Sequence, residues 1–184
     1  MLILASASPR RRELLGLLGI EFEVVPSDVE ELTRGRPADV VVENALRKAR
    51  AVTADAGDAL VLGADTDVAI DGRLLGKAAD SETARSHLRT LAGRTHEVLG
   101  GIALIRSGEE ETALVTTAVT FRALSEAEVD AYVASGEWHD RAGAYAVQGL
   151  GASLVERVEG DLSNVIGLAI PTLAAMIAGL QDRE

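Results

Sequence analysis

The sequence contains no cysteine, and histidine and aromatic side chains are scarce. The lack of cysteine excludes disulfides, a thiolate nucleophile and a cysteine-ligated zinc site. The three histidines (His87, His96 and His139) are scattered, which argues against a histidine-rich metal site. Aromatic residues make up 3% of the chain and the net charge is −11, so we expect neither nucleic acid nor an anionic membrane as a partner.

The chain also lacks a run of about 20 uninterrupted apolar residues, the length needed to span a membrane. Its N-terminus has no basic region ahead of the apolar residues, because Arg10–Arg12 follow them. This order disfavours a signal peptide, and we expect a cytoplasmic protein. The 184 residues, 47% of them hydrophobic, suffice for one sizeable core or for one core with a small second lobe.

Hydrophobic periodicity and turn signals predict strands and helices in alternation along the chain. The expected strands cover residues 2–5, 21–25, 59–70, 73–75, 96–106, 112–124 and 152–158. The expected helices cover residues 9–18, about 17 residues around 38–52, 81–91, 125–135 and 166–180. Turns at Asp71-Gly72 and Ser107-Gly108 indicate antiparallel hairpins. The pattern favours an α/β protein with a mixed sheet, and no repeat or long linker divides residues 1–184 into separate domains.

The first helix begins with an unusual charge pattern. Ser8 suits the N-cap and Pro9 the first helical position, but Arg10, Arg11 and Arg12 then fall in the first turn. The helix dipole already presents positive charge there, so each arginine opposes it by roughly 0.3–1 kcal/mol. A bound polyanion would reverse that sign and make the arginines a phosphate clamp. The alternative is a solvated surface cluster.

Two groups of carboxylates are candidates for chemistry. Asp65 and Asp67 lie on one face of an otherwise apolar strand, where a charge is costly unless it is paired, exposed or bound to a cation. They predict either a divalent-cation site or a carboxylate that activates water, and the alternative is an exposed strand end. In the preceding loop, Asp28, Glu30 and Glu31 could add oxygen ligands or could be solvated surface.

Lys48 and Gln148 are two further polar candidates. Lys48 falls at the edge of the apolar stripe of its helix, so it either extends its ammonium group into water or contacts phosphate. Gln148 ends a loop of small residues that would let the backbone approach a ligand, and its amide could read a base edge. An ordinary structured loop is the alternative. Neither a P-loop nor a GxGxxG fingerprint is present.

Taken together, these motifs resemble those of the Maf family over essentially the whole chain. The resemblance is carried by Ser6-Ala7-Ser8-Pro9-Arg10-Arg11, Ala45–Ala49 with Lys48, Gly63-Ala64-Asp65-Thr66, Gly76-Lys77, Ala142–Gly149 and Gly160–Leu168. It implies a nucleoside triphosphate pyrophosphatase that uses Mg²⁺ or Mn²⁺ to release a nucleoside monophosphate and pyrophosphate. It also implies an elongated mixed sheet with two lobes around a central cleft, similar to inosine triphosphate pyrophosphatases, in a homodimer.

The resemblance implies a role for each matching position. Asp65 would be the catalytic acid–base residue and Glu31 a second acidic residue, and the two would hold the metal. The phosphate-binding residues would be Ser8, Arg11, Lys48 and Lys77. The specificity positions Arg10, Thr66 and Gln148 match the dTTP/UTP branch of the family, which leaves modified pyrimidine nucleotides as further substrates. The alternatives are the same reaction on 7-methyl-GTP or another modified purine nucleotide, and a non-catalytic nucleotide-binding regulator of septum formation.

Four positions depart from the family pattern. Gly100 replaces a threonine, Arg141 replaces a lysine, and Ala78 and Ala169 replace prolines. The proline losses should soften turns without removing chemistry. Arg141 keeps the positive charge but changes its geometry. The family's threonine hydroxyl at this position is expected to line the cleft, and Gly100 lacks it. The substrate preference of the family therefore applies less directly to this chain.

Overall fold

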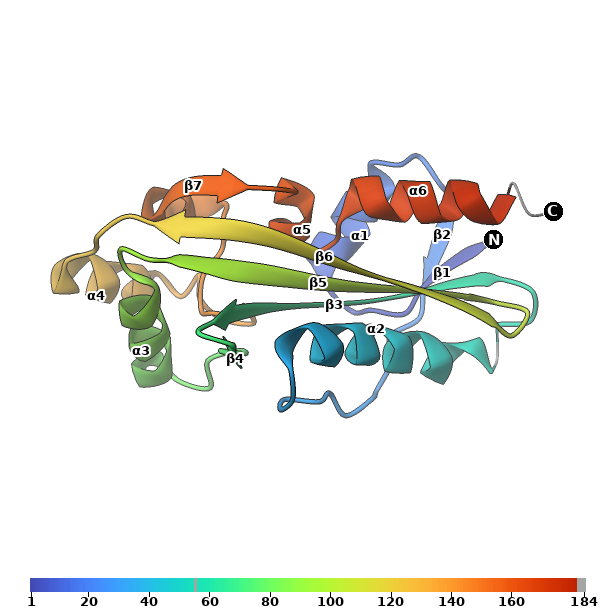
Figure 1. Ribbon diagram of the computed structural model, residues 1–184, viewed down its shortest axis with the longest axis horizontal. Coiled ribbons are helices and arrows are strands. Elements are labelled where there is room, and N and C mark those ends of the chain that lie inside the picture. Colours follow the sequence, from blue (N-terminus) through green and yellow to red (C-terminus); the bar gives the residue numbers. More distant parts are fainter. Residues whose placement is uncertain (55, 182–184) are drawn as a thin grey trace.

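The computed structural model describes residues 1–54 and 56–181 as a mixed sheet covered by helices on both faces (Figure 1). Its strands are β1 (Leu2–Leu4), β2 (Phe22–Val24), β3 (Leu60–Ile70), β4 (Arg73–Leu74), β5 (Thr95–Arg106), β6 (Glu109–Phe121) and β7 (Val155–Glu159). The strand order is β2-β1-β3-β5-β6-β7, with β4 paired to β3. The first three strands in this order run parallel and the other pairings are antiparallel, which confirms the predicted α/β class with a mixed sheet.

The helices follow the predicted apolar periodicity in most places. They are α1 (Pro9–Gly16), α2 (Pro37–Thr53), α3 (Ser81–Leu91), α4 (Glu126–Ser135), α5 (Leu162–Ile166) and α6 (Ile170–Gln181), with a 3-10 turn η1 (Gly149–Leu154). None of the helices in the described ranges is long and apolar enough to cross a membrane.

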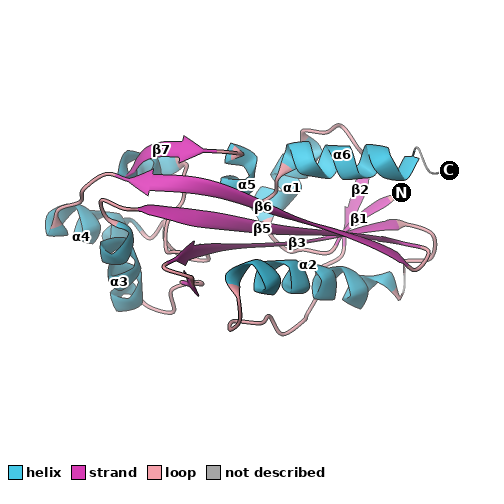
Figure 2. Ribbon diagram, viewed as in Figure 1, coloured by secondary structure: helices cyan, strands magenta, loops and turns pink. Residues whose placement is uncertain are grey.

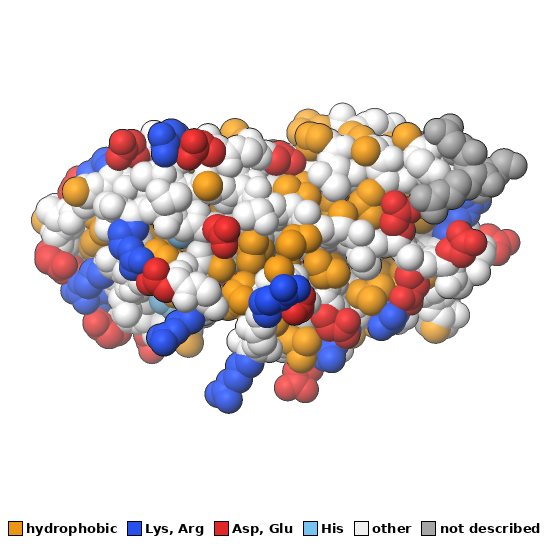
Figure 3. Space-filling view, viewed as in Figure 1, with side chains coloured by type: hydrophobic (Ala, Val, Ile, Leu, Met, Phe, Trp, Pro, Cys, Tyr) orange, Lys and Arg blue, Asp and Glu red, His pale blue; other side chains and the backbone are white. Residues whose placement is uncertain are grey.

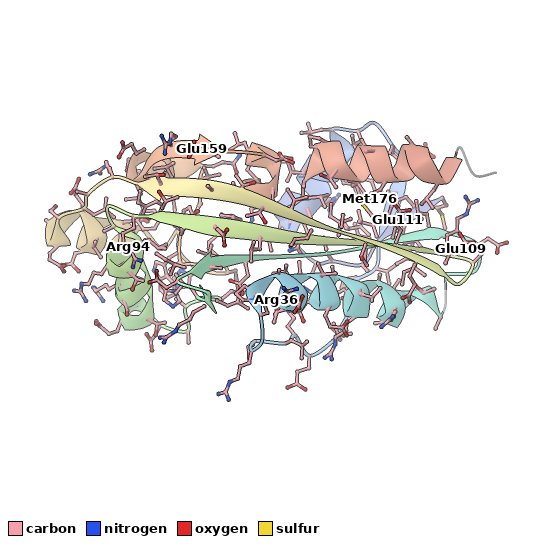
Figure 4. The ribbon with its side chains drawn as sticks, viewed as in Figure 1. Arg36, Arg94, Glu109, Glu111, Glu159 and Met176 are labelled. Atoms are coloured by element: carbon pink, nitrogen blue, oxygen red, sulfur yellow. The ribbon has the colours of Figure 1, made fainter. Side chains whose placement is uncertain are left out.

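The N-terminal half of the sheet lies between two helical layers. On one face, α2 packs Ala45, Ala49 and Val52 against β1, β3 and β5. On the other face, α1 and α6 cover the same strands (Figure 2). Met176 belongs to this second layer and lies between α6 and the sheet (Figure 4).

A second core fills the other end of the elongated molecule. It joins α3 and α4 to the far ends of β3, β5 and β6, with Phe121, Tyr132 and Trp138 among its large side chains. The long strands pass through both cores, so they tie the two ends of the molecule together (Figure 1). In the face drawn in Figure 3, apolar side chains gather in the middle and charged ones lie around them.

The structure corrects two predicted elements. Residues 152–158 are not one strand, because η1 occupies residues up to Leu154 and only then does β7 begin. The 3-10 turn forms because the Glu137 carboxylate accepts hydrogen bonds from the backbone N–H groups of Leu150 (3.0 Å) and Gly151 (3.2 Å).

The predicted helix 166–180 is interrupted at Gly167. This residue has φ 145°, a conformation that glycine adopts without a Cβ penalty, and it separates α5 from α6. Ser8 does stand at the N-cap of α1, but its side chain makes no capping hydrogen bond.

Candidate functional site

A cavity of about 510 Å³ opens along β3, where its neighbours in the sheet stop. β1 pairs with β3 only at Leu60–Leu62, and β4 pairs with it only at Ala69 and Ile70. Asp65–Val68 line the cavity between these two pairings. The position is just beyond the carboxyl ends of the parallel strands β1 and β2, where open α/β sheets bind ligands.

The cavity brings together all nine side chains to which the family resemblance assigns a role, although they come from segments scattered along the chain. Its lining includes Ser8, Arg10, Arg11, Glu31, Lys48, Asp65, Thr66, Lys77 and Gln148. Both cores of the molecule contribute walls, because the lining also contains Val98 and Tyr145 from the second core. Asp28, Glu30 and Arg12 are exposed and do not line this cavity.

Asp65 and Glu31 converge on Lys48. The Lys48 ammonium lies 2.7 Å from Asp65 Oδ1 and 2.6 Å from Glu31 Oε1. Lys48 is 6% exposed and Asp65 is 8% exposed, whereas the Glu31 side chain is 44% exposed. Lys48 therefore does not extend into bulk water, and in this structure its ammonium group is paired with two carboxylates.

Asn44 organises this acidic group, and our sequence reasoning missed it. Its amide donates to Asp65 Oδ2 at 3.1 Å. The same side chain accepts from Leu32 N (2.7 Å) and donates to Leu32 O (3.0 Å), which fixes the loop that carries Glu31. The available signal was a polar residue between Val40, Val41 and Ala45 on the buried face of the predicted helix.

Arg11 reaches the cavity from the opposite face of the sheet. Its guanidinium donates to Gly167 O (3.0 Å), Ser6 Oγ (3.0 Å) and Thr66 Oγ1 (3.4 Å). Thr66 Oγ1 in turn donates to Gly167 O at 3.1 Å. Burial lowers the pKa of Arg11 below its ordinary value, and the negative charges of Asp65 and Glu31 act in the opposite direction.

Arg10 lines the wall next to Asp140 and Arg141. Its Nη2 donates to the Asp140 carbonyl at 3.2 Å. Burial lowers the pKa of Arg10 to about 10, the positive charges of Arg141 and Arg11 add to that shift, and Asp140 opposes it. The first two arginines of the run thus face the cavity, while Arg12 faces solvent.

Lys77 and Gln148 lie toward the solvent side of the cavity, and both are exposed. Lys77 forms an isolated antiparallel bridge with Ala142, and Gly143 N donates to Gly76 O at 2.8 Å. These backbone contacts fix the loop after α4 beside the turn that carries Lys77. Gln148 immediately precedes η1, and its side chain does not cap that turn.

Asp67 has a different environment from Asp65, although both lie on β3. Its Oδ1 accepts from Val68 N (2.7 Å) and Gly76 N (3.0 Å). Burial nevertheless raises the pKa of Asp67 to about 6, because it outweighs these two hydrogen bonds and is reinforced by the charges of Asp65 and Glu31. Asp67 thus ties Gly76, the residue before Lys77, to β3 at the cavity.

Gly100 does not line the cavity, contrary to the expectation for this position. A Cβ at Gly100 would overlap Asn164 Oδ1. Asn164 is fully buried and donates to Val98 O (3.0 Å) and Thr117 Oγ1 (3.1 Å). The glycine therefore leaves room for the side chain that anchors α5, and α5 leads directly to the Gly167 carbonyl that holds Arg11.

The carboxylates of the cavity are hard oxygen donors of the kind that Mg²⁺ and Mn²⁺ prefer. Within residues 1–54 and 56–181, no group of three or more His, Cys, Asp or Glu side chains is placed to hold a metal ion by itself. In the usual Mg²⁺ site of an enzyme, one or two carboxylates bind the ion, and water molecules and substrate phosphates complete its coordination. The two carboxylates of Asp65 and Glu31 are sufficient for such a site.

Comparison with known proteins gives one consistent relationship. A family model described as Maf-like protein matches residues 1–180. A Deinococcus radiodurans protein named dTTP/UTP pyrophosphatase is 48% identical over 178 residues, covering 96% of this chain and 91% of the relative. A Bacillus cereus protein with the same name is 47% identical over 174 residues, covering 94% and 91%. With a cavity lined by all nine residues to which the motifs assign a site role, and a match along nearly its whole length, this chain belongs to the Maf-like protein family.

Proposed function

We propose that this protein hydrolyses the α–β phosphoanhydride of dTTP and UTP, and of modified pyrimidine nucleotides, to a nucleoside monophosphate and pyrophosphate. The names of its relatives support the reaction and the substrates. The observation that carries the proposal is the buried Asp65 carboxylate, which Lys48 and Asn44 hold at a cavity whose other wall carries Arg10 and Arg11. A carboxylate facing cationic walls suits hydrolysis of a polyanion.

Asp65 is positioned to act on water. Lys48 holds one carboxylate oxygen and Asn44 the other, so the side chain cannot turn away from the cavity. Each carboxylate oxygen has a second lone-pair position that can accept a proton or a water hydrogen bond. Phosphoryl chemistry needs little covalent help from the protein, so an oriented water and neutralised phosphates account for most of the catalysis.

Asp65 and Glu31 are also the residues that would hold the divalent cation. When bound, Mg²⁺ or Mn²⁺ supplies charge neutralisation at the phosphate oxygens. The chain's own contribution is to keep both carboxylates at one point: Asn44 fixes the Glu31 loop, and Lys48 prevents repulsion between the two acids.

The decisive experiment is Asp65→Asn, with Asp58→Asn as a matched control on the exposed surface. We expect pyrophosphate release from dTTP to fall roughly 10²- to 10⁴-fold in Asp65→Asn, the usual contribution of a general base. Nucleotide binding, measured by calorimetry, should persist, because asparagine preserves the shape and one hydrogen-bond acceptor. Chelation of divalent cations should abolish turnover in the parent protein, and added Mg²⁺ or Mn²⁺ should restore it.

The same variant separates the alternatives. A nucleotide-binding regulator of septum formation would release no pyrophosphate in the parent form either. Undiminished turnover in Asp65→Asn would refute the role of Asp65 even if the reaction is correct. Hydrolysis of 7-methyl-GTP in preference to dTTP and UTP would keep the mechanism and change the substrate.

We further propose that the protein acts in the cytoplasm and as a homodimer. The outer edge of β6 is covered by β7 only from Ala118 onward, and Leu114 on the uncovered part is 43% exposed. A second copy seated there would cover apolar surface that a monomer leaves in water. Sedimentation equilibrium gives the mass directly, and a monomer at micromolar concentration would contradict the proposal.

A further inference from the structure

Arg141 is a cation of the cavity wall whose side chain has no partner in the described chain. It lines the cavity, and its Nε is buried without a hydrogen bond. Within residues 1–54 and 56–181, its guanidinium makes no hydrogen bond or ion pair. Exposed arginines elsewhere, such as Arg50 and Arg89, form paired hydrogen bonds with glutamates. A buried donor without an acceptor costs stability, so its retention at a cavity points to a ligand.

The backbone holds Arg141 in place by an unusual turn. Asp140 has φ 55° and Ala144 has φ 60°, the left-handed region that residues with a side chain rarely adopt. Between them, Ala142 bridges Lys77, and Gly143 N donates to Gly76 O. Strained backbone of this kind persists where the surroundings fix it, often at ligand sites. The turn therefore places Arg141 beside Lys77 at one wall of the cavity.

The neighbourhood of Arg141 is rich in unpaired positive charge. Arg10, Arg11 and Lys77 line the same cavity, and none of them lies within 4.0 Å of a carboxylate in the part of the chain that the structure describes. The positive charges repel one another, because the charge of Arg141 adds to the burial that lowers the pKa of Arg10. An anion with several charged oxygens would relieve such a cluster.

We propose that Arg141 is a substrate-binding residue that contacts the distal (β and γ) phosphates of the nucleoside triphosphate, together with Arg10, Arg11 and Lys77. This inference rests on the proposed function for the identity of the ligand. Phosphate fits better than a base, because a guanidinium presents a planar fork that matches two phosphate oxygens. Lys48 is not part of this cluster, since its ammonium group is already paired with Asp65 and Glu31.

The test measures binding without turnover. Calorimetry with inorganic tripolyphosphate and, separately, with thymidine monophosphate is performed on the parent protein, Arg141→Gln, Arg141→Lys and Arg12→Gln. Arg12→Gln removes the same charge at an exposed position outside the cavity. We expect Arg141→Gln to weaken tripolyphosphate binding roughly 10- to 100-fold, the usual effect of losing a charge-assisted bidentate contact. The tripolyphosphate affinity of Arg141→Lys should lie between those of Arg141→Gln and the parent protein. Arg12→Gln should bind tripolyphosphate as tightly as the parent protein does.

Thymidine monophosphate binding should change little in Arg141→Gln, because this ligand lacks the distal phosphates. Equal tripolyphosphate affinity in Arg141→Gln and in Arg12→Gln would overturn the inference, and so would an equal loss for both ligands. Circular dichroism checks that each variant is folded. If Arg141→Gln does not fold, the comparison is made between Arg141→Lys and Arg12→Gln. Failure of the proposed function would give a different result. The parent protein would then bind tripolyphosphate but release no pyrophosphate from any nucleotide.

Discussion

Replacement of Gly63 by alanine tests whether the site depends on the close contact between α2 and the sheet. A Cβ at Gly63 would overlap the Ala45 carbonyl oxygen and lie 2.8 Å from Ala49 N and 2.9 Å from Ala49 Cβ. These are atoms of a buried helix, so they cannot swing aside as the end of a flexible side chain would. The helix must move away from β3, and Asn44 and Lys48 move with it.

The magnitude follows from the size of this overlap. Overpacking a core usually costs about 1–3 kcal/mol, and we take the upper end because the opposing atoms are backbone. For a chain of this length, about 3 kcal/mol lowers the melting temperature by roughly 6–12 °C. Displacement of catalytic groups by about an ångström costs about 10²-fold in rate, so kcat/KM for dTTP should fall by a similar factor.

The assay combines thermal unfolding with pyrophosphate release, and Gly16→Ala is the matched control. Gly16 ends α1 and has no atom within 4 Å of its Cβ position, so its substitution should change stability by less than about 1 kcal/mol. Gly101→Ala should behave like Gly63→Ala, since its Cβ would overlap the Val41 carbonyl on the same helix. If Gly63→Ala melts and turns over like the parent protein, α2 is not held against the sheet as described.

Two further predictions concern buried charge and base selection. Burial lowers the pKa of His96 to about 4, so the unfolded chain binds more protons between pH 4 and pH 6.5; stability should fall by about 3 kcal/mol as pH drops through that window. Urea unfolding at several pH values gives the free energy of unfolding as a function of pH. This free energy should depend less steeply on pH for His96→Gln than for the parent protein, and equal pH dependence would refute the prediction. Gln148→Ala should reduce selectivity among dTTP, UTP and 7-methyl-GTP more than it reduces kcat, because its exposed amide can both donate to and accept from a base edge; an unchanged ratio of kcat/KM values would place base selection elsewhere.

The elements that sequence predicted best are those fixed by local signals. Apolar spacing located α2, and the Asp71-Gly72 turn located the hairpin between β3 and β4. The break at Gly167 was missed because its cause is not local. Its carbonyl accepts from Arg11 and Thr66, which are 156 and 101 residues away in the chain. Apolar spacing across the break looks continuous, and only the folded chain shows why the helix must stop there.

The site was predictable as a set of residues but not as a distribution of charge. Sequence motifs selected residues that line one cavity, because each motif carries a chemical type suited to polyphosphate. They could not show that Lys48 lies between Asp65 and Glu31, since the position of Glu31 depends on the bonds between Asn44 and Leu32. Arg141 was noted only as a departure from a pattern, because nothing local reveals that a side chain will lack a partner.

The charge distribution resolves how an acidic protein can hold a polyanion. A net charge of −11 repels nucleotides at long range, but the field inside a cavity depends on the nearest unpaired groups. Here Lys48 partly neutralises Asp65 and Glu31, and Arg10, Arg11 and Arg141 line the same cavity without an ion pair in the described part of the chain. A triphosphate entering with its phosphates toward the arginines would present its reacting phosphorus to Asp65. Electrostatics would therefore favour the distal phosphates at the arginines before any base contact is made.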